Sequence, residues 1–357
     1  MPSPQLSTSQ MPGRLLGPRS VQSASIADVA RLAGVSAQTV SRVSTGAQSV
    51  RPETKARVLK AMAQLGYTPN QAARALRDGR FKTIGVITQQ VSRTGEALIT
   101  ASIVEAAAEK GYSINLFQVA HPETEELTQA GRRLSQQSVD GLIIVQAGQA
   151  QPAALNLPAN MPVVASDSAF IDIYPSVVHN QEHGVNEAMR HLLDLGHQRI
   201  AHITGPSDSR SALMRRAAWR RSLEEAGHPA PDPHLGDWSA KSGYYAGKAI
   251  AEDPAVTAVF CANDEIAFGL MRALHDAGRR VPDDVSVVGF DGIELSEFSA
   301  PALTTVRQDF RSVGRELVDL LLEQMHQPSH SHAHQIAQRV VRSELVIRDS
   351  TAQPRAL

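Results

Sequence analysis

Three polar side chains stand at the ends of short apolar runs in this chain. Asp167 ends the run PVVASD, Asn263 ends AVFCAN and Asp291 ends VSVVGFD. Ligands of parallel α/β sheets bind beyond the carboxyl ends of the strands, where these three residues are expected to lie. A carboxylate or an amide can engage two hydroxyl groups, whereas a phosphate site calls for a glycine-rich turn, which the sequence lacks. The pattern therefore predicts a sugar-binding cleft, against the plainer alternative that each residue only caps or turns the chain.

Arg215 and Trp238 are further candidates for the same cleft. Arg215 lies ten residues after the end of an apolar run, and its guanidinium offers a planar fork of donors. Trp238, in GDWSAKSGY, offers a ring face that suits the C–H side of a pyranose. Each residue alone has an ordinary structural explanation, so it is the convergence of the whole set that indicates a ligand site.

A different kind of site is indicated near the N-terminus. Residues 25–44, SIADVARLAGVSAQTVSRVS, predict two short helices capped by Ser25 and Ser36 and separated by a turn at Gly34. A third helix is expected from Pro52 to Gly66. This is the pattern of a helix-turn-helix, whose second helix enters the major groove of DNA. The side chains expected to pack inward are Ile26, Val29, Ala30, Leu32, Val40, Val43, Val58, Leu59, Met62 and Leu65.

The second of these helices carries the residues expected to contact DNA. Gln38 can pair bidentately with adenine and Arg42 with guanine, so these two are predicted to read bases. Phosphate contacts fix the register without specifying sequence, and they are expected from the hydroxyls of Ser36, Thr39, Ser41 and Tyr67. The alternative is a three-helix module that binds protein.

The charge distribution separates this head from the rest of the chain. Residues 24–82 hold ten basic and three acidic residues, whereas residues 83–357 hold 23 basic and 33 acidic ones. The net charges are +7 and −10, within a total of −1. A basic head on an acidic body is typical of a protein that meets a polyanion with one end, although a merely solvated basic face is the alternative.

Composition places the chain among soluble globular proteins. Its 357 residues are 42% hydrophobic, and no apolar run approaches the roughly 18 residues that cross a bilayer. Cys261 is the one cysteine and residues 1–23 resemble no secretory signal, so a reducing cytoplasm is expected. No hydrolase, zinc-protease or nucleotide-loop motif is present, so we predict no enzyme, no cofactor and no metal. A solvated loop, rather than a metal site, is expected for the histidines His326, His330, His332 and His334.

From residue 83 onward, short β-branched runs alternate with amphipathic helical stretches. Near-continuous apolar strands of this kind indicate parallel sheets covered on both faces. The strands are too many for one sheet, so two α/β lobes are expected. The expected strands are Thr83–Thr88, Tyr112–Val119, Gly141–Gln146, Pro162–Asp167, Ser176–Asn180, Arg199–Gly205, Ala258–Asn263, Val285–Asp291 and Thr304–Asp309.

A short segment joins the head to the lobes. In YTPNQAARALRDGRFKT, Asn70 follows Pro69 as a helix cap, and about two turns of helix are expected up to Arg77. So short a helix is marginal in isolation. Leu76, its one large apolar side chain, is expected to wedge into the minor groove of DNA, unless the segment is a plain linker.

These motifs together resemble the lactose-repressor family of bacterial transcription regulators. IADVARLAGVSAQTVSRV, YTPNQAARAL and IGVI match the family's DNA-binding and hinge segments. The cleft motifs GHQRIAHITGP, GDWSAKSGY, ANDEIAFGLMRAL, DVSVVGFDG and PALTTVRQDF are closer to the lactose repressor than to the family at large. The resemblance implies an all-α helix-turn-helix head with a hinge helix, followed by a two-lobed α/β core like a periplasmic sugar-binding protein.

The sequence pattern and the resemblance together predict the domain boundaries. A disordered extension is expected over 1–23, the helix-turn-helix domain over 24–68, the hinge helix and linker over 69–82, the two-lobed effector-binding and dimerisation domain over 83–348, and a tail over 349–357. Three crossovers join the lobes. Lobe one is expected to take about 83–179 and 308–338, and lobe two about 180–307 and 339–348.

Residues of both sites receive roles from the resemblance. The resemblance adds four residues to those expected to contact DNA, namely Ser25, Ala37, Asn70 and Ala73. The residues that match sugar-hydroxyl ligands are Asp167, Arg215, Asn263 and Asp291. The residues that match apolar wall positions are Trp238 and Phe310. Those that match peripheral polar contacts are Ser211 and Gln308.

Departures from the lactose repressor lie on one side of the implied cleft. Gln89, Val145 and His179 stand where that repressor has serine, asparagine and phenylalanine. Because the galactose-type contacts are kept, a glycoside or disaccharide effector is expected, such as a β-galactoside. Ala37 replaces a tyrosine of the recognition helix, so the operator is expected to differ at one base contact.

The function that these features predict is repression of a carbohydrate-utilisation operon by a homodimer that a sugar inducer releases from double-stranded operator DNA. The lack of the leucine heptads with which the lactose repressor forms tetramers favours a dimer. No membrane partner is expected. The alternative is a sugar-binding receptor or a sugar-processing enzyme whose helical head serves assembly, and the missing signal peptide and acid–base pair argue against it.

Overall fold

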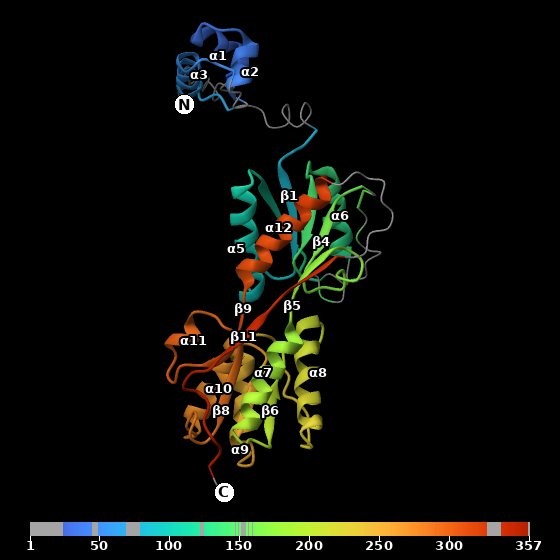
Figure 1. The fold of residues 1–357 in the computed structure, drawn as a ribbon, viewed down its shortest axis with the longest axis vertical. Coiled ribbons are helices and arrows are strands. Elements are labelled where there is room, and N and C mark those ends of the chain that lie inside the picture. The colour runs from blue at the N-terminus through green and yellow to red at the C-terminus, as the bar shows by residue number, and fades with distance from the viewer. Residues whose placement is uncertain are drawn as a thin grey trace, which may run out of the picture. The chain divides into compact units, whose positions relative to one another are not determined.

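The computed structural model of the chain describes residues 24–44, 49–68, 79–121, 125–146, 148, 150, 155, 157–158, 160–326 and 337–355. It divides into two compact units, Met1–Gly79 and Arg80–Leu357. Figure 1 shows the elements of both units along the chain.

The first unit is a three-helix head. Its helices are α1 (Ile26–Ala33), α2 (Ala37–Ser44) and α3 (Pro52–Leu65). A capping box begins α1, because the Ser25 hydroxyl accepts the Asp28 N–H at 3.3 Å while the Asp28 carboxylate accepts the Ser25 N–H at 3.0 Å. Gly34 ends α1 with φ +63°, a conformation that glycine adopts without strain. These ends match the sequence prediction.

The core of the head is smaller than the sequence predicted. Val29, Val40 and Val58 are fully buried at its centre, and Val43 and Met62 pack beside them. The prediction that Leu32, Leu59 and Leu65 pack inward was wrong, since their exposed fractions are 51%, 48% and 37%. On α3 the buried residues are Val58, Ala61 and Met62. Leu59 directly follows Val58, and because successive residues of a helix are about 100° apart, its side chain lies away from the buried face.

Several predicted segments lie outside the described residues. These are the extension 1–23, the hinge helix with Asn70, Ala73 and Leu76, and the histidines His330, His332 and His334.

The second unit begins with a fully parallel six-stranded sheet, in the order β10-β5-β4-β3-β1-β2. Helices α5 (Thr94–Glu109) and α12 (Phe310–His326) cover one face, and α6 (Glu125–Gln136) covers the other. We call this half lobe one. Its strands are β1 (Thr83–Thr88), β2 (Ser113–Gln118), β3 (Gly141–Ile144), β4 (Val163–Ala165), β5 (Ser176–His179) and β10 (Gln338–Val341).

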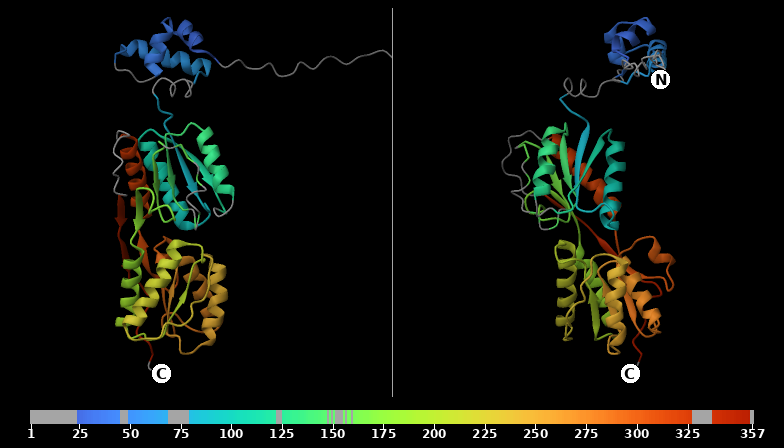
Figure 2. Two further views of the ribbon diagram at one scale, coloured as in Figure 1. Left: turned by 90° about the vertical axis from the view of Figure 1, so that its right-hand side faces the viewer. Right: turned by 180° about the vertical axis from the view of Figure 1, so that it is seen from behind.

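Lobe two is built on a five-stranded sheet in the order β11-β9-β8-β7-β6. Helices α7 (Gln181–Asp194) and α8 (Arg210–Glu225) pack on one face, and α9 (Ala240–Glu252) and α10 (Asp264–Asp276) on the other. Figure 2 shows both sheets edge-on between their helices. The strands are β6 (Ile200–Ile203), β7 (Ala258–Cys261), β8 (Ser286–Asp291), β9 (Thr304–Gln308) and β11 (Ser343–Val346), and α11 (Leu295–Phe298) follows β8.

The chain passes between the lobes three times, after β5, after β9 and between β10 and β11 (Figure 1). The third passage lies later than the expected boundary at 338/339. Residues 338–341 form β10, which pairs with β5 in lobe one, while β11 pairs antiparallel with β9 in lobe two. The crossover is therefore at Arg342.

The last described residues belong to lobe two. The Ser350 side chain accepts the Thr304 N–H at 2.8 Å and donates to the Val287 carbonyl at 2.6 Å, and Ser350 is fully buried. Within the described ranges, no helix is long and apolar enough to cross a membrane. The same residues contain no group of three or more His, Cys, Asp or Glu side chains placed to hold a metal ion.

Candidate functional site

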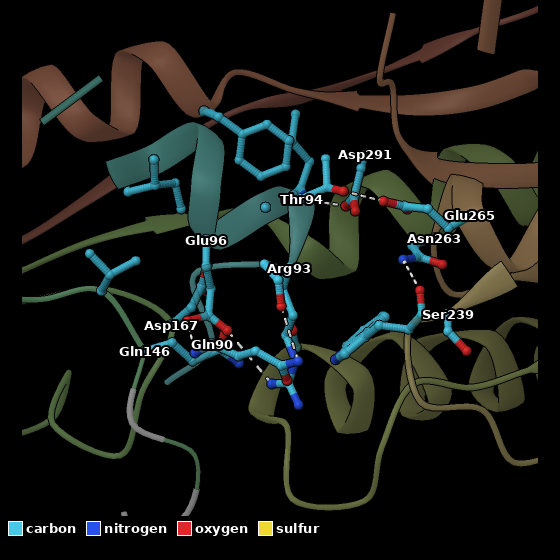
Figure 3. A pocket seen from close by; sticks show the side chains of 18 of the residues that line it. Gln90, Arg93, Thr94, Glu96, Gln146, Asp167, Ser239, Asn263, Glu265 and Asp291 are labelled. Carbon is cyan, nitrogen blue, oxygen red and sulfur yellow. Dashed lines mark hydrogen bonds and ion pairs between the residues drawn. The ribbon is translucent and has the colours of Figure 1, made fainter. Parts of the chain in front are cut away.

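The cleft between the lobes holds a cavity of about 350 Å³, within the size range of small-molecule sites. Figure 3 shows most of the side chains that line it. The structure brings all eight residues implied for effector binding to this one cavity: Asp167, Ser211, Arg215, Trp238, Asn263, Asp291, Gln308 and Phe310.

Most of these side chains are positioned by strand ends. Asp291 is the last residue of β8, Gln308 is the last of β9, and Asp167 and Asn263 each lie two residues beyond a strand. Three residues of the cavity have positive φ, which is +41° at Asp167, +74° at Trp238 and +102° at Asp291. Such strained conformations of non-glycine residues persist where the surroundings enforce them, and they cluster at ligand sites.

A buried network around Arg215 fixes the carboxylate of Asp291. The Arg215 Nε donates to Gln181 Oε1 at 2.8 Å, its Nη1 donates to the Ala262 carbonyl, and its Nη2 lies 3.3 Å from Asp291 Oδ1. Gln308 Nε2 donates to the same Asp291 oxygen at 2.6 Å. Burial raises the pKa of Asp291 to about 6, although the nearby Arg215 charge lowers it. The network holds acceptor and donor groups in fixed directions at the floor of the cavity.

Asn263 combines a structural role with a place in the cavity. Its Oδ1 caps α10 by accepting the Ile266 N–H at 2.9 Å, and its Nδ2 donates to the Trp238 carbonyl at 3.0 Å. The capping role weighed in the sequence analysis is therefore real, and Asn263 also holds the loop that carries Trp238. Gly205 packs against the Trp238 ring so closely that a Cβ there would lie 2.4 Å from a ring carbon.

Two of the three departures noted in the sequence do not line the cavity. Val145 does, but His179 lies behind it, with Nδ1 3.7 Å from Asp167 Oδ2 and its ring edge-to-face with Phe310 at 5.2 Å. Gln89 is also buried, and its Nε2 donates to Asp208 Oδ2 at 3.5 Å. His179 therefore supports two lining residues, and Gln89 makes a contact from lobe one to lobe two.

Sequence reasoning missed the part of the cavity that follows β1. This segment, with the end of β3, supplies a mostly polar wall. The same strand-end rule that selected Asp167 would have found it, because β1 and β3 are neighbours whose carboxyl ends meet the cleft. The missed lining residues are Gln90, Ser92, Arg93, Thr94, Gly95, Glu96, Ile99, Gln146, Asp237, Ser239 and Glu265.

Hydrogen bonds from Gln89 and from Thr94 tie lobe one to lobe two beside the cavity. One is the Gln89–Asp208 contact, and in the other the Thr94 hydroxyl donates to the Glu265 carboxylate (Figure 3). The other carboxylate oxygen of Glu265 is buried without a hydrogen-bond partner in the structure.

Asp264 follows the cavity residue Asn263, is fully buried, and is expected to give the fold a pH dependence. Burial raises its pKa to about 8, although the Thr305 hydroxyl donates to Oδ1 at 2.5 Å and the Ile293 N–H donates to Oδ2 at 2.8 Å. The pKa of an unfolded aspartate is about 3.9. Between about pH 4 and pH 8, the folded protein therefore keeps a proton on Asp264 that the unfolded chain has lost.

We expect the free energy of unfolding to fall as pH rises from about 4 to about 8, by up to about 1.4 kcal/mol per pH unit from this group. The check is urea unfolding of the protein and of Asp264→Asn at several pH values. The variant should show a flatter dependence across this window, and parallel pH profiles would contradict the assignment.

The head presents the predicted base-reading residues on its surface. Ala37, Gln38 and Arg42 are exposed on α2, while Thr39 and Ser41 are half-buried. Ser36 caps α2, because its hydroxyl accepts the Thr39 N–H at 3.2 Å. Tyr67 packs against the apolar core of the head. Ser25 is likewise a cap, so Ser25, Ser36 and Tyr67 all have structural roles.

A helix-turn-helix head followed by a two-lobed core with a ligand cavity defines a ligand-responsive DNA-binding regulator. Comparisons with known proteins agree. Residues 25–70 match the bacterial regulatory proteins of the lacI family, and residues 189–351 match the periplasmic binding protein-like domain. The lactose operon repressor of Escherichia coli (strain K12) is 37% identical over 340 residues, covering 92% of this chain and 93% of that protein. The chain belongs to the lacI family of bacterial regulatory proteins and is a DNA-binding transcriptional repressor with a ligand-binding core.

Other relatives and solved structures span the same family. The repressor PurR of Histophilus somni (strain 129Pt) is 34% identical over 334 residues, covering 92% of this chain and 98% of that protein. The crystal structure of the Lac repressor dimer bound to operator and the anti-inducer ONPF has a TM-score of 0.81 and 35% identity, covering 93% of this chain and all of that one. A complex of the transcriptional regulator CelR with cellobiose has a TM-score of 0.68 and 29% identity. The match covers 92% of this chain and 99% of that one.

Proposed function

We propose that this repressor controls a carbohydrate-utilisation operon and that a sugar, of the β-galactoside class, is its inducer. The observation that carries the proposal is the cavity, in which Asp167, Arg215, Asn263 and Asp291 converge as polar ligands next to the Trp238 ring. Hydrogen-bonding groups on fixed strand ends beside an aromatic face suit a pyranose, which has hydroxyls at its rim and C–H groups on its faces.

The repressor acts in the cytoplasm as a homodimer whose two heads read half-sites of a near-palindromic operator, while Leu76 of each hinge enters the minor groove. The inducer favours an arrangement of the lobes that separates the hinges, so sugar binding and DNA binding oppose each other by linkage. Support for this scheme comes from the operator-bound Lac repressor dimer, whose whole chain is matched by 93% of this one.

The test is fluorescence anisotropy of a labelled, library-selected operator, titrated with the protein and then with lactose, allolactose, galactose, ribose and cellobiose. Release by a galactoside supports the proposal. Release by ribose or cellobiose alone would replace the galactoside with that sugar as the inducer. Tight binding that no sugar disturbs would overturn the inducer assignment.

For the head, we expect Arg42→Ala to weaken operator binding by about 1–3 kcal/mol and to relax preference at one base position, because a bidentate contact to guanine is lost. Binding should be measured by anisotropy on the operator and on single-base variants. An equal loss on every sequence would make Arg42 a phosphate contact instead.

A further inference from the structure

His179 lies where the three passages between the lobes meet. It is the last residue of β5, and it pairs with Val341, the last residue of β10 before the third passage. The next residue, Asn180, donates its N–H to the Val341 carbonyl at 2.9 Å. From the second passage, the Phe310 ring lies edge-to-face against the His179 ring, with 5.2 Å between the ring centres. Contacts from all three passages therefore fix the position of His179.

The His179 ring is buried, and its hydrogen-bonding capacity is unused. Its side chain is 1% exposed, and neither ring nitrogen has a hydrogen-bond partner among the described residues. Nδ1 lies 3.7 Å from Asp167 Oδ2, which is too long for a hydrogen bond but within the range of an ion pair. Because an unpaired buried polar group costs free energy, the ring would gain from a proton that pairs it with Asp167.

Asp167 connects His179 to the cavity. Its side chain lines the cavity and is 18% exposed, so water screens its charge when the cavity is empty. A ligand that fills the cavity removes this water. Two opposite charges attract about fourfold more strongly at an effective dielectric constant of about 20 than in bulk water. His179 is already buried and loses no further hydration, so ligand binding favours its protonated form.

The other charged groups around His179 also favour a positive ring. Asp291 and Asp309 both interact electrostatically with His179. The cations of the neighbouring elements are paired or exposed: Arg215 on α8 pairs with Asp291, Arg339 on β10 pairs with Glu316 and Glu323, and Arg342 is exposed. On α7, Glu182 is exposed and paired with Arg221.

We propose that His179 is a positioning residue of the effector site, which takes up a proton when an effector fills the cavity and then holds the Asp167 carboxylate by an ion pair. The affinity for effector should therefore rise as pH falls through the range in which histidine titrates, between about pH 8 and pH 5. This inference rests on the proposed function, because it assumes that the effector occupies the cavity beside Asp167.

The test is calorimetric titration of the full-length protein with lactose, in phosphate and in Bis-Tris. The difference in heat between buffers of different ionisation enthalpy counts the protons that binding takes up. Lactose has no group that titrates near neutral pH, so these protons reside on the protein. A proton held about tenfold more tightly in the complex gives an uptake of about 0.5 proton per site at pH 6.5 and an affinity about fivefold higher at pH 6 than at pH 8. We expect effects of this size.

Two variants remove the titrating group. His179→Phe keeps a ring against Phe310, and His179→Gln keeps a polar group, but neither side chain can be protonated. Both should abolish the proton uptake and flatten the pH profile of lactose affinity. The matched control is His183→Gln, which replaces an exposed histidine of α7 and should leave the uptake unchanged.

Asp291 is the other group of the cavity that titrates in this range, because burial raises its pKa to about 6. A ligand hydroxyl that donates to Asp291 favours the charged carboxylate and releases a proton, so its contribution has the opposite sign.

No proton uptake by the unchanged protein, or equal uptake in both His179 variants, overturns the inference and leaves the repressor proposal standing. Circular dichroism at pH 6 and pH 8 checks that the variants fold, and the measurement on the unchanged protein decides even where they do not. If lactose fails to bind, galactose and cellobiose are titrated in its place. Failure of all three sugars at every pH overturns the proposed function together with this inference.

Discussion

Arg215→Met is expected to lower the free energy of unfolding by about 3–5 kcal/mol, because it leaves the buried Asp291 carboxylate without its cation. The Arg215 side chain is 4% exposed, and its three donor nitrogens contact Gln181, Ala262 and Asp291. Methionine fills a similar volume but donates no hydrogen bond. The loss also removes a donor fork from the cavity, so effector binding should disappear together with stability.

Urea unfolding followed by circular dichroism measures the first effect, and calorimetry the second. Arg199→Met is the matched control, since its ion pair with Asp253 is half-exposed and such pairs contribute about 0–1 kcal/mol. The double variant Arg215→Met with Asp291→Asn should recover part of the stability but no ligand binding. A double variant as unstable as the single one would show that lost packing, not the unpaired charge, causes the effect.

Gly205→Ala is expected to displace the Trp238 ring, which lines the cavity. A Cβ at this position would lie 2.4–2.6 Å from three atoms of the Trp238 ring. The ring cannot easily retreat, because the Trp238 backbone has φ +74° and its carbonyl is held by Asn263. Overpacking of this kind costs about 1–3 kcal/mol, and here it displaces an apolar wall of the ligand site.

The change should appear in two measurements. Fluorescence should report an altered environment of Trp238, since the only other tryptophan, Trp219, is fully buried in lobe two. Calorimetry should show a loss of sugar affinity of at least about tenfold. Combining Gly205→Ala with Trp238→Leu removes the ring that the new Cβ contacts. The free energy of unfolding should then recover, while the affinity for sugar should not. Unchanged affinity in Gly205→Ala would mean that Trp238 does not contact the ligand.

The strand-end rule found one half of the cavity, and it could have found the other half only with the strand order known. Asp167, Asn263 and Asp291 were predicted because each is a lone polar residue after an apolar strand. Arg93 was missed because it reads, in sequence, as an ordinary surface residue at the start of a helix. Its role depends on the strand order β3-β1-β2, which places the end of β1 at the point where the sheet connections diverge, and that order is not visible in the local pattern.

The secondary structure was predictable wherever the hydrophobic pattern extended over a whole strand or helix. All nine expected strands are present, but β10 and β11 were not predicted because charged residues interrupt QRVVRSELV and both strands lie at sheet edges. The exposed Leu59 shows the opposite failure. Hydrophobicity alone suggested burial, whereas the three-helix head is too small to cover every leucine on its helices.

The bonds from Gln89 to Asp208 and from Thr94 to Glu265 join the two lobes and have a consequence for timing. Both must break before the lobes can move apart, so each adds to the barrier for any change in the arrangement of the lobes. Under the proposed inducer scheme, this barrier would slow both the release of the repressor from its operator and its return.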